Sequence, residues 1–350
     1  MPDAPAGADA APRDEEELEE RLSRPRPGVT AALASVPGDI LVLGAGGKMG
    51  PSLAAMARRT VQALGDGRRV VAVSRWSDPA ARDRLAAMGV EVLAADLADR
   101  DALAALPDAP NVVYMAGQKF GTTDDPARTW HMNAVVPAMV AERFAGSRVV
   151  AFSTGNVYPL VRADSPGARE DHTLTPVGEY ANSCVARERV LEHVARTRGM
   201  PLALVRLSYA VDLRYGVLVD IASRVLAGEP VPLAMGWANV IWQGEANAQA
   251  LRCLPLAAAP APFVVNVTGP ERLPVREAAT WLGERLGRAP RFAGTEGPDA
   301  LLSDTTRARS HFGEPEVGAR TLLAWVADWV ARGGRRLGKP THFEVRDGRY

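Results

Sequence analysis

The chain has 350 residues, enough to bury a large core in one domain or in two. Its 41 acidic and 41 basic side chains balance, so no bulk charge favours nucleic acid or an anionic membrane as a partner. No apolar run approaches the ~20 residues of a membrane span, and the start of the chain carries no secretory hydrophobic segment. Cys184 and Cys253 form neither a metal-binding nor a disulfide pattern. We therefore expect a soluble cytoplasmic protein without a metal site.

Residues 1–37 are predicted to form an N-terminal extension. Its first 13 residues are rich in Ala, Pro and Asp, a composition typical of disorder. An acidic helix is predicted at Asp14–Leu22, and Pro25 and Pro27 are expected to end it. The extension is therefore predicted to be partly disordered, with one short helix.

From Asp39 onward, apolar strand patterns alternate with helical patterns. Strands are predicted at Ile40–Leu43, Arg69–Ser74, Val90–Ala94, Val112–Met115, Val149–Ser153 and Leu202–Leu207. Helices are predicted at 51–64, 79–88, 99–106, 126–144 and 180–198. This alternation predicts an α/β fold in which a doubly wound parallel (Rossmann) sheet forms a dinucleotide-binding domain over residues 38–208.

After Tyr209 the alternation fades. Helices near 217–227, 243–254, 274–287 and 319–332, with a strand at Phe263–Val267, predict a smaller, mainly helical substrate-binding lobe. This lobe is expected over residues 209–332, with returns to the Rossmann domain. Residues 333–350 form a C-terminal tail, in which a strand is predicted at His342–Val345 before an Asp-Gly turn.

The glycine-rich turn after the first strand is the strongest functional signal. Gly44, Gly47 and Gly50 recur at three-residue spacing between a buried-strand pattern and an amphipathic helix. Met49 stands where G-x-G-x-x-G would need its last glycine, so the turn fits G-x-x-G-x-x-G instead. Strand, glycine turn and helix N-terminus together form a phosphate site, and we predict that Lys48 and Met49 belong to it. The alternative is an ordinary tight turn.

Further motifs follow the later strands in a definite order. They are Ala95-Asp96-Leu97, Tyr114-Met115-Ala116-Gly117, Asn133, the segment Phe152-Ser153-Thr154-Gly155-Asn156-Val157-Tyr158, and Tyr180. With the glycine turn, they resemble the extended short-chain dehydrogenases/reductases, the family of nucleotide-sugar epimerases and dehydratases, from Asp39 to about Arg332. The resemblance implies that the cofactor is bound by Asp96, Leu97, Met115, Ala116, Gly117, Asn133 and Ser153.

The same resemblance implies a homodimer formed through the helices at 126–144 and 180–198. Periodicity alone fits equally well two helices that pack on their own sheet.

The end of the second strand indicates which dinucleotide is bound. An acidic residue there takes the ribose hydroxyl of NAD, whereas an arginine accommodates the 2′-phosphate of NADP. The strand ends in Ser74 and Arg75 without a carboxylate, and Lys48 is a second cation within reach of the same phosphate. We therefore predict NADP in preference to NAD. In the alternative, Ser74 takes the ribose and both cations are solvated.

The resemblance makes Tyr180 the general acid/base. It also makes Thr154, four residues before Tyr158, the hydroxyl that orients the substrate oxygen. In the family, a lysine four residues after the tyrosine lowers the phenol pKa from ~10 toward neutrality. Cys184 takes that place here and is expected to be a small packed residue.

Three hypotheses follow from the missing lysine. Another cation substitutes, with Lys119 favoured over Arg187; or the tyrosine acts only as a proton donor; or the chain has lost hydride chemistry.

The substrate side also departs from the nucleotide-sugar pattern. Tyr209 replaces an expected asparagine, and residues 236–242 contain no arginine to pair with a diphosphate. Trp237 and Trp242 either form a pocket wall or pack within the lobe. We predict an NAD(P)-dependent oxidoreductase or epimerase for a small polyol, sugar acid or related hydroxy/keto compound. The alternatives are a catalytically silent dinucleotide-binding sensor or scaffold, and a lyase or isomerase that uses its cofactor transiently.

Overall fold

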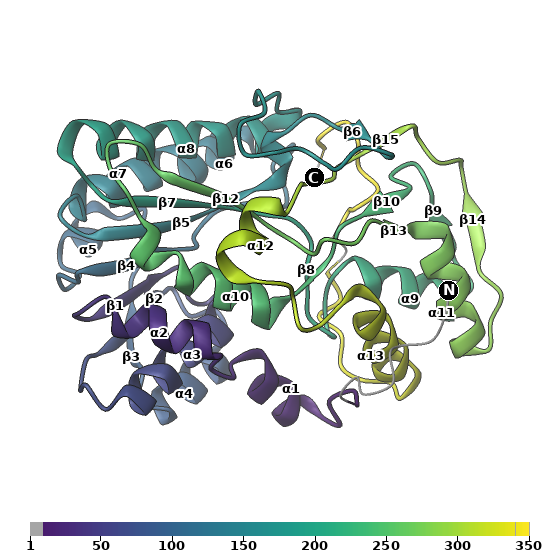
Figure 1. Cartoon of the computed structure of the whole chain (residues 1–350), viewed down its shortest axis with the longest axis horizontal. Helices are drawn as coiled ribbons and strands as arrows, with labels where there is room; N and C mark the ends of the chain where they lie inside the picture. Colours follow the sequence, from purple (N-terminus) through teal and green to yellow (C-terminus); the bar gives the residue numbers. More distant parts are fainter. Residues whose placement is uncertain (1–9, 340, 350) are drawn as a thin grey trace.

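The computed structural model describes residues 10–339 and 341–349 of the chain. At its centre lies a sheet of seven parallel strands in the order β12-β7-β5-β4-β1-β2-β3 (Figure 1). The strands are β1 Ile40–Leu43, β2 Val70–Ser74, β3 Glu91–Ala94, β4 Asn111–Tyr114, β5 Arg148–Thr154, β7 Leu202–Leu207 and β12 Phe263–Val267. The strand order reverses between β1 and β4, which is where doubly wound sheets bind their ligands. The predicted fold class is confirmed.

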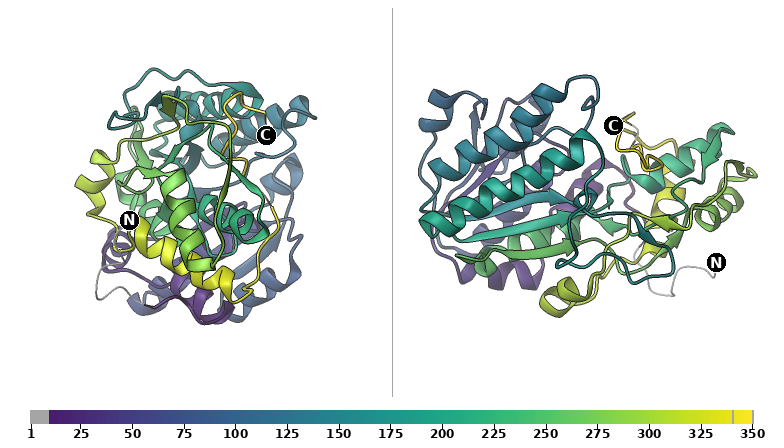
Figure 2. Two further views of the ribbon diagram at one scale, coloured as in Figure 1. Left: turned by 90° about the vertical axis from the view of Figure 1, so that its right-hand side faces the viewer. Right: turned by 90° about the horizontal axis from the view of Figure 1, so that it is seen from above.

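Helices cover both faces of this sheet (Figures 1 and 2). One face carries α2 Pro27–Ala34, α3 Gly50–Leu64, α4 Pro79–Ala87 and α10 Gln243–Arg252. The other carries α5 Arg100–Ala104, α7 Val136–Arg143 and α8 Gly178–Arg198, with α6 Pro126–Trp130 and the π-helical turn η1 His131–Val135 before α7. Along β1, Ile40 and Val42 pack on the first set, and Leu41 and Leu43 on the second. All four are fully buried, as expected of a parallel strand covered on both faces.

A second lobe is built on α9 Val217–Ala227, α11 Val275–Leu286 and α13 Ala319–Ala331 (Figure 1). Its core includes Leu18 and Leu22 of α1 Glu15–Leu22, and both leucines are fully buried. Within the N-terminal extension, α1 therefore packs with this lobe, whereas α2 packs on the sheet. Of the 13 residues predicted to be disordered, the first nine lie outside the described residues. The prediction is wrong for the last of them, because Arg332 donates to the carbonyls of Pro12 and Arg13. The sequence did not predict α2. Pro27 stands at its start, where the missing N–H has no helical partner to lose.

Short elements complete the chain. They are η2 Gly155–Val157, β6 Val161–Arg162, β8 Ala210–Val211, β9 Pro230–Pro232, β10 Trp237–Ala238, β11 Ile241–Trp242, η3 Leu254–Leu256, β13 Leu273–Pro274, β14 Arg291–Ala293, β15 Asp299–Ala300 and α12 Thr306–Phe312. The strand predicted at Phe263–Val267 forms, but as β12 at the edge of the main sheet beside β7. It is one of the expected returns to the Rossmann domain. In the described part of the chain, no helix combines the length and the apolar character that crossing a membrane requires.

The C-terminal tail does not form the predicted strand at His342–Val345. It crosses the second lobe without a strand partner, and its end lies at the junction of the lobes (Figure 2). The amide and hydroxyl of Thr341 donate to the Asp220 carboxylate at 2.7 and 2.6 Å, and Phe343 is buried in the second-lobe core. Contacts with side chains far along the sequence therefore fix the tail in place of a strand ladder.

Candidate functional site

Three glycines shape the turn between β1 and α3. Gly44 has a φ of +85°, and a Cβ on it would lie 2.6 Å from the amide nitrogen of Ala116. A Cβ on Gly50 would lie 2.4 Å from the carbonyl oxygen of Ala45, so glycine allows the helix to approach the turn. Gly47 is exposed, and the nearest atom to its Cβ would be 3.5 Å away. A ligand can therefore approach the backbone closely at Gly47.

The start of α3 is suited to an anion. Met49 is the N-cap residue and makes no side-chain capping hydrogen bond, and the helix runs for 15 residues. The unpaired N–H groups of its first turn and its dipole together favour a phosphate at this end. The turn and the helix therefore fit the pyrophosphate of a dinucleotide.

A cleft of about 250 Å³ opens beside this turn. Of the predicted cofactor residues, it is lined by Gly44, Gly47, Lys48, Met49, Gly50, Met115, Gly117 and Ser153. Tyr180, Lys119 and Arg187 line it too. Phe152, Gln118 and Leu207 complete its wall and were not predicted. The rule that carboxyl ends of parallel strands meet at one edge would have found Phe152 and Leu207, which lie near the ends of β5 and β7.

Six predicted cofactor residues are not among those that line this cleft, and four of them, Ser74, Arg75, Asp96 and Leu97, lie at or just after the ends of β2 and β3. A Cβ on Gly46 would lie 2.4 Å from the hydroxyl of Ser74, so Ser74 borders the glycine turn. The Arg75 guanidinium lies 3.8 Å from the Asp96 carboxylate, and both side chains are exposed. Leu97 is buried. Because β2 is the neighbour of β1, these residues extend the glycine turn along the sheet edge in the direction expected for an adenosine half.

The position of Lys48 differs from the one predicted for it. Its Nζ donates to the carbonyl oxygen of Ala210 at 2.8 Å and lies 4.2 Å from the centre of the Tyr215 ring. Ala210 lies just after β7, on the opposite side of β1 from β2. The prediction that Lys48 reaches a 2′-phosphate beside Arg75 is therefore wrong. Burial lowers the pKa of Lys48 to about 7.

The environment of Asn133 also differs from the prediction that it binds the cofactor. Its Oδ1 accepts from the Gln118 amide at 2.8 Å and from Arg187 at 2.7 Å. Its Nδ2 donates to the Gln118 carbonyl at 2.8 Å and to Ser183 at 3.0 Å. These bonds use the full hydrogen-bonding capacity of the amide. Fully buried in the π-helical turn, Asn133 positions the loop after β4 instead of contacting a cofactor. Ala116, beside that loop, lies against Gly44.

A second, smaller pocket of about 150 Å³ adjoins the cleft. The two cavities share Lys48, Met49, Lys119, Ser153, Tyr180 and Leu207. Thr154 and Asn156 line the pocket from the end of β5, Tyr215 from the second lobe, and Thr341 from the tail. The structure therefore brings the predicted catalytic residues Tyr180, Thr154 and Lys119 to one pocket. It also adds Asn156, which lies in the predicted motif but was given no role, and Tyr215 and Thr341, which no motif in the sequence indicates.

Cys184 is fully buried among Val157, Tyr158 and Ala168, as expected of a small packed residue. Burial raises the pKa of its thiol, and a hydrogen bond with Tyr180 opposes this effect. The phenol of Tyr180 therefore lies against a neutral thiol where the resemblance places an ammonium group.

The two candidate cations beside Tyr180 differ in their surroundings. Arg187 is buried, and its guanidinium donates to the Phe152 carbonyl at 2.9 Å and to Asn133. Lys119 lines both cavities, and its Nζ donates to the Thr341 carbonyl at 3.5 Å. Burial lowers the pKa of Lys119 to about 8, while Cys184 and Asp220 raise it. Arg187 thus braces the wall of the cleft, and Lys119 faces the space that Tyr180 faces.

A buried polar network lies behind the shared wall. Ser153 donates to Glu188 at 2.5 Å, and Arg206 pairs with the same carboxylate at 2.7 Å. Arg206 also donates to the Tyr158 hydroxyl at 2.7 Å, which in turn donates to Asn266 at 2.8 Å. The Ser153 hydroxyl thus donates to a buried carboxylate, whereas the Thr154 hydroxyl donates to the side-chain oxygen of Asn156 at 3.0 Å inside the small pocket. Thr154 therefore has the weaker, uncharged partner to exchange for a substrate oxygen.

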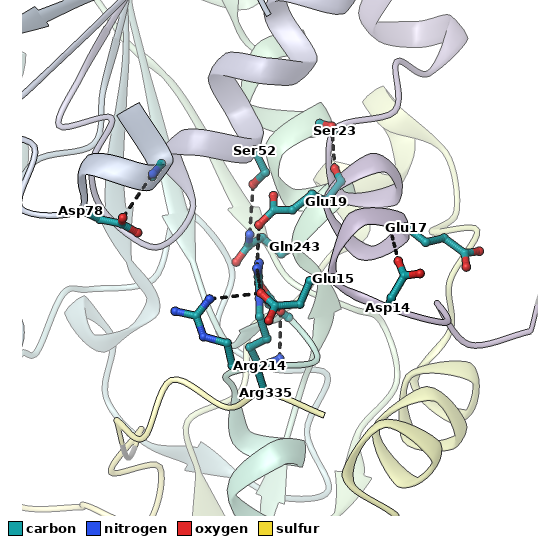
Figure 3. Close-up of polar contacts among 12 residues, drawn as sticks. Asp14, Glu15, Glu17, Glu19, Ser23, Ser52, Asp78, Arg214, Gln243 and Arg335 are labelled. Carbon is teal, nitrogen blue, oxygen red and sulfur yellow. Dashed lines mark hydrogen bonds and ion pairs between the residues drawn. The ribbon is translucent and has the colours of Figure 1, made fainter. Parts of the chain in front are cut away.

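The base of the small pocket is linked to the N-terminal extension. Arg214 pairs with buried Asp212 at 2.6 Å and with Glu19 of α1 at 2.6 Å. Glu15 lies 3.7 Å from Arg214 and 3.2 Å from Arg335, and Figure 3 shows these side chains converging. The acidic face of α1 thus holds the loop that carries Tyr215.

The predicted aromatic pocket wall is absent from both cavities as the described residues form them. Trp242 is buried in the second-lobe core, where its ring meets that of Trp325 edge-on at 5.3 Å. Trp237 packs against the cluster that contains Met235 and Leu301. Both tryptophans therefore serve lobe packing.

The chain was compared with protein families, with curated proteins and with solved structures. The model of the family described as "NAD dependent epimerase/dehydratase family" matches residues 40–234, more than half of the chain. A search of curated proteins finds no match.

Among solved structures, the UDP-glucose 4-epimerase of Thermotoga maritima with UDP-glucose is 19% identical, with a TM-score of 0.66 over 84% of this chain and 99% of that one. The UDP-Glc/GlcNAc 4-epimerase of Campylobacter jejuni is 20% identical, with a TM-score of 0.69 over 85% and 100%. The UDP-glucose 4-epimerase of Thermus thermophilus in complex with NAD is 21% identical, with a TM-score of 0.65 over 84% and 99%. At such identities the likeness shows the fold alone. The extent of the family match shows more: this chain belongs to the NAD dependent epimerase/dehydratase family.

Proposed function

We propose that the chain is an NAD(P)-dependent oxidoreductase or epimerase that acts on a small polyol, sugar acid or related hydroxy/keto compound. The observation that carries the proposal is the wall that two cavities share, which contains Tyr180, Lys119 and Ser153. A compound in the small pocket lies next to the cleft that the glycine turn suits for a dinucleotide. When bound, the dinucleotide supplies a hydride acceptor or donor.

In this proposal, the side chains of the small pocket have separate catalytic roles. Tyr180 gives a proton to the substrate oxygen or takes one from it, and Thr154 holds that oxygen by a hydrogen bond. Lys119 replaces the cation missing at position 184, because a nearby ammonium group favours the phenolate of Tyr180. With its pKa lowered to about 8, Lys119 is mostly charged at neutral pH.

The size of the pocket supports a small substrate. Pockets for drug-sized molecules run to roughly 300–1,000 Å³, and this pocket has about 150 Å³. The neighbour from Thermotoga maritima was solved with UDP-glucose, which is a much larger molecule. We propose that this chain takes a compound without a nucleotide.

The proposed preference for NADP over NAD rests on Arg75 alone, since Lys48 points into the small pocket. Arg75 stands exposed near Asp96, and a 2′-phosphate would be drawn to its guanidinium. A preference for NAD of tenfold or more in measured dissociation constants would remove this part of the proposal.

The proposal is tested by comparing the turnover of the wild type with that of a variant that lacks the Tyr180 hydroxyl. Wild-type protein and Tyr180→Phe are assayed against a panel of hydroxy and keto compounds with NAD and NADP in both redox states. We expect turnover with at least one compound, and a loss of about 10²–10⁴-fold in kcat for Tyr180→Phe, as general acid–base catalysis contributes. A variant as active as the wild type would contradict the assigned role of Tyr180.

A second candidate function is a catalytically silent sensor of the dinucleotide. The neutral thiol of Cys184 beside Tyr180 favours it, because an unassisted phenol titrates near ~10 and is a poor base. Tight dinucleotide binding without turnover of any panel compound would support the sensor. A cofactor that copurifies and is not consumed would instead support a lyase or isomerase.

A homodimer through α6, α7 and α8 stays part of the proposal. On these helices Val136, Val140 and Leu191 are fully buried against the chain's own sheet. Val135 and Trp130 remain about 40% exposed on this side of the molecule. Light scattering on the purified protein decides between one copy and two.

A further inference from the structure

The small pocket carries two ammonium groups and no acidic side chain among the described residues that line it. Lys48 enters from the glycine turn, and Lys119 enters from the loop after β4. Both lysines are partly buried, and each donates to a backbone carbonyl and lies near an aromatic ring. The charge of Lys119 is one of the causes that lower the pKa of Lys48, after burial.

The nearest carboxylates are already engaged. Asp212, which acts on Lys48, accepts two hydrogen bonds from the Arg214 side chain at 2.6 and 3.1 Å. Asp220, which acts on both lysines, accepts from the amide and hydroxyl of Thr341. Bringing like charges together in a partly desolvated pocket is unfavourable, and an entering anion reduces this cost. The pocket therefore suits an anionic group.

We propose that the pocket selects a small hydroxy acid. Its carboxylate lies between the Nζ atoms of Lys48 and Lys119, and its hydroxyl faces Tyr180 and Thr154. This inference rests on the proposed function and names the substrate class within it. A polyol of the same size has no group that would offset the two positive charges, so a carboxylate, rather than hydroxyls alone, is what the pocket recognises.

Binding of a carboxylate should be linked to protons. An anion between the lysines favours their charged forms, so their pKa values rise from about 7 and about 8 on binding. The complex then takes up protons from about pH 7 upward, and the affinity falls as the pH rises through the same range. The other charged or titratable groups that act on Lys48 are Asp212, Arg214, Asp220 and the nearby Tyr215, and those that act on Lys119 are Cys184 and Asp220.

The test measures equilibrium binding without turnover. Glycerate and lactate, and the matched neutral compounds glycerol and lactamide, are titrated by calorimetry into protein saturated with NADPH or NADH, whichever binds. Reduced cofactor and a hydroxy compound form a dead-end pair, so no reaction disturbs the heat. We expect each acid to bind at least tenfold more tightly than its neutral partner, with net proton uptake when buffers of different ionisation heat are compared.

Variants assign the effect to the two lysines. Lys119→Met and Lys48→Met should each reduce the preference for acid over neutral compound by at least tenfold. Lys339→Met is the matched control, since this lysine is exposed and lies outside the pocket lining, and it should leave the preference unchanged. Lys48→Met can also weaken cofactor binding, because Lys48 lines the cofactor cleft. In that case the acid preference of Lys119→Met, measured at saturating cofactor, tests the inference.

Three results would overturn the inference: equal affinity for acids and neutral compounds, an unchanged preference in both lysine variants, or glycerol 3-phosphate binding tenfold more tightly than glycerate. Failure of the proposed function has a different signature, which is the absence of turnover with every panel compound. The titrations stand if a reduced dinucleotide still binds, as in a silent sensor, but they need another form if neither dinucleotide binds. In that case, titration of the same acids and neutral compounds into the protein alone still decides whether the pocket selects a carboxylate.

Discussion

The two cavities that meet at Tyr180 are built in different ways. Around Gly44, Gly47 and Gly50 the cofactor cleft is made of main chain, and its shape depends on the lack of side chains. The small pocket is made of side chains from the glycine turn, the loop after β4, the second lobe and the tail. The cleft thus depends on where side chains are missing, whereas the pocket depends on which side chains are present.

We also expect the two cavities to contribute differently to the stability of the fold. The cleft requires close backbone contacts around its glycines. The pocket places two lysines near each other and is backed by buried ion pairs, among them Glu188 with Arg206 and Asp212 with Arg214. Sites shaped for function commonly lower stability, and the pocket is where that effect is expected here.

The largest expected effect concerns the ion pair behind the shared wall. Arg206→Met leaves the buried Glu188 carboxylate without its cation, and we expect the free energy of unfolding to fall by about 3–5 kcal/mol. Arg189→Met on the same helix as Glu188 breaks an exposed pair with Glu192 and should cost less than about 1 kcal/mol. Urea denaturation of both variants measures the contrast, and equal losses would show that the network adds nothing to the wall.

The next effect concerns the cleft. Gly47→Ala adds a methyl group that meets only an atom 3.5 Å away, so the fold should tolerate it. The methyl group occupies the approach of a pyrophosphate, and we expect dinucleotide affinity to fall by about 10–100-fold, roughly 1.4–2.8 kcal/mol.

Gly146→Ala is the control for this variant, because open space surrounds its Cβ. It should leave both affinity and thermal stability unchanged. Full dinucleotide affinity in Gly47→Ala would mean that the main chain of this turn does not hold the phosphates.

The smallest effect concerns the charge of Lys48. Its pKa in the folded chain is about 7, well below the ordinary 10.5, so the folded state binds fewer protons than the unfolded state between these values. The wild type should therefore gain stability as the pH rises from 7 toward 10. Lys48→Met should be more stable than the wild type by roughly 1–2 kcal/mol at pH 6, and the advantage should shrink at higher pH.

Denaturation at pH 6 and pH 9 measures this difference for the pair of proteins. A Lys48→Met variant that is less stable than the wild type at pH 6 would show that the pocket does not strain this lysine.

The sequence predicted the cleft better than the pocket, for a physical reason. The buried runs Ile40–Leu43, Leu202–Leu207 and Phe263–Val267 form strands at the predicted bounds. Apart from Arg206 and Asn266, these runs are apolar because helices cover both sides of the sheet, and this local pattern needs no knowledge of partners. The glycine spacing likewise reports a local backbone requirement.

The pocket depends on contacts that no local pattern records. Thr341 reaches Asp220 from 121 residues away, and Lys48 reaches Ala210 from 162 residues away. The same limit explains the errors over Lys48 and Asn133, whose residue types suit a cofactor site but whose partners lie on other elements. For Trp242 the sequence left a pocket wall and lobe packing open, because its partner Trp325 in the second-lobe core lies far along the chain.

The central claim is that the turn between β1 and α3 binds a dinucleotide, and direct titration tests it best. Purified protein, first shown to carry no nucleotide, is titrated by calorimetry with NAD⁺, NADH, NADP⁺ and NADPH. The account predicts saturable binding of at least one of them, with NADP(H) favoured over NAD(H). Absence of heat with all four at millimolar concentration would contradict it, and the roles proposed for Tyr180, Thr154 and Lys119 would fall with it.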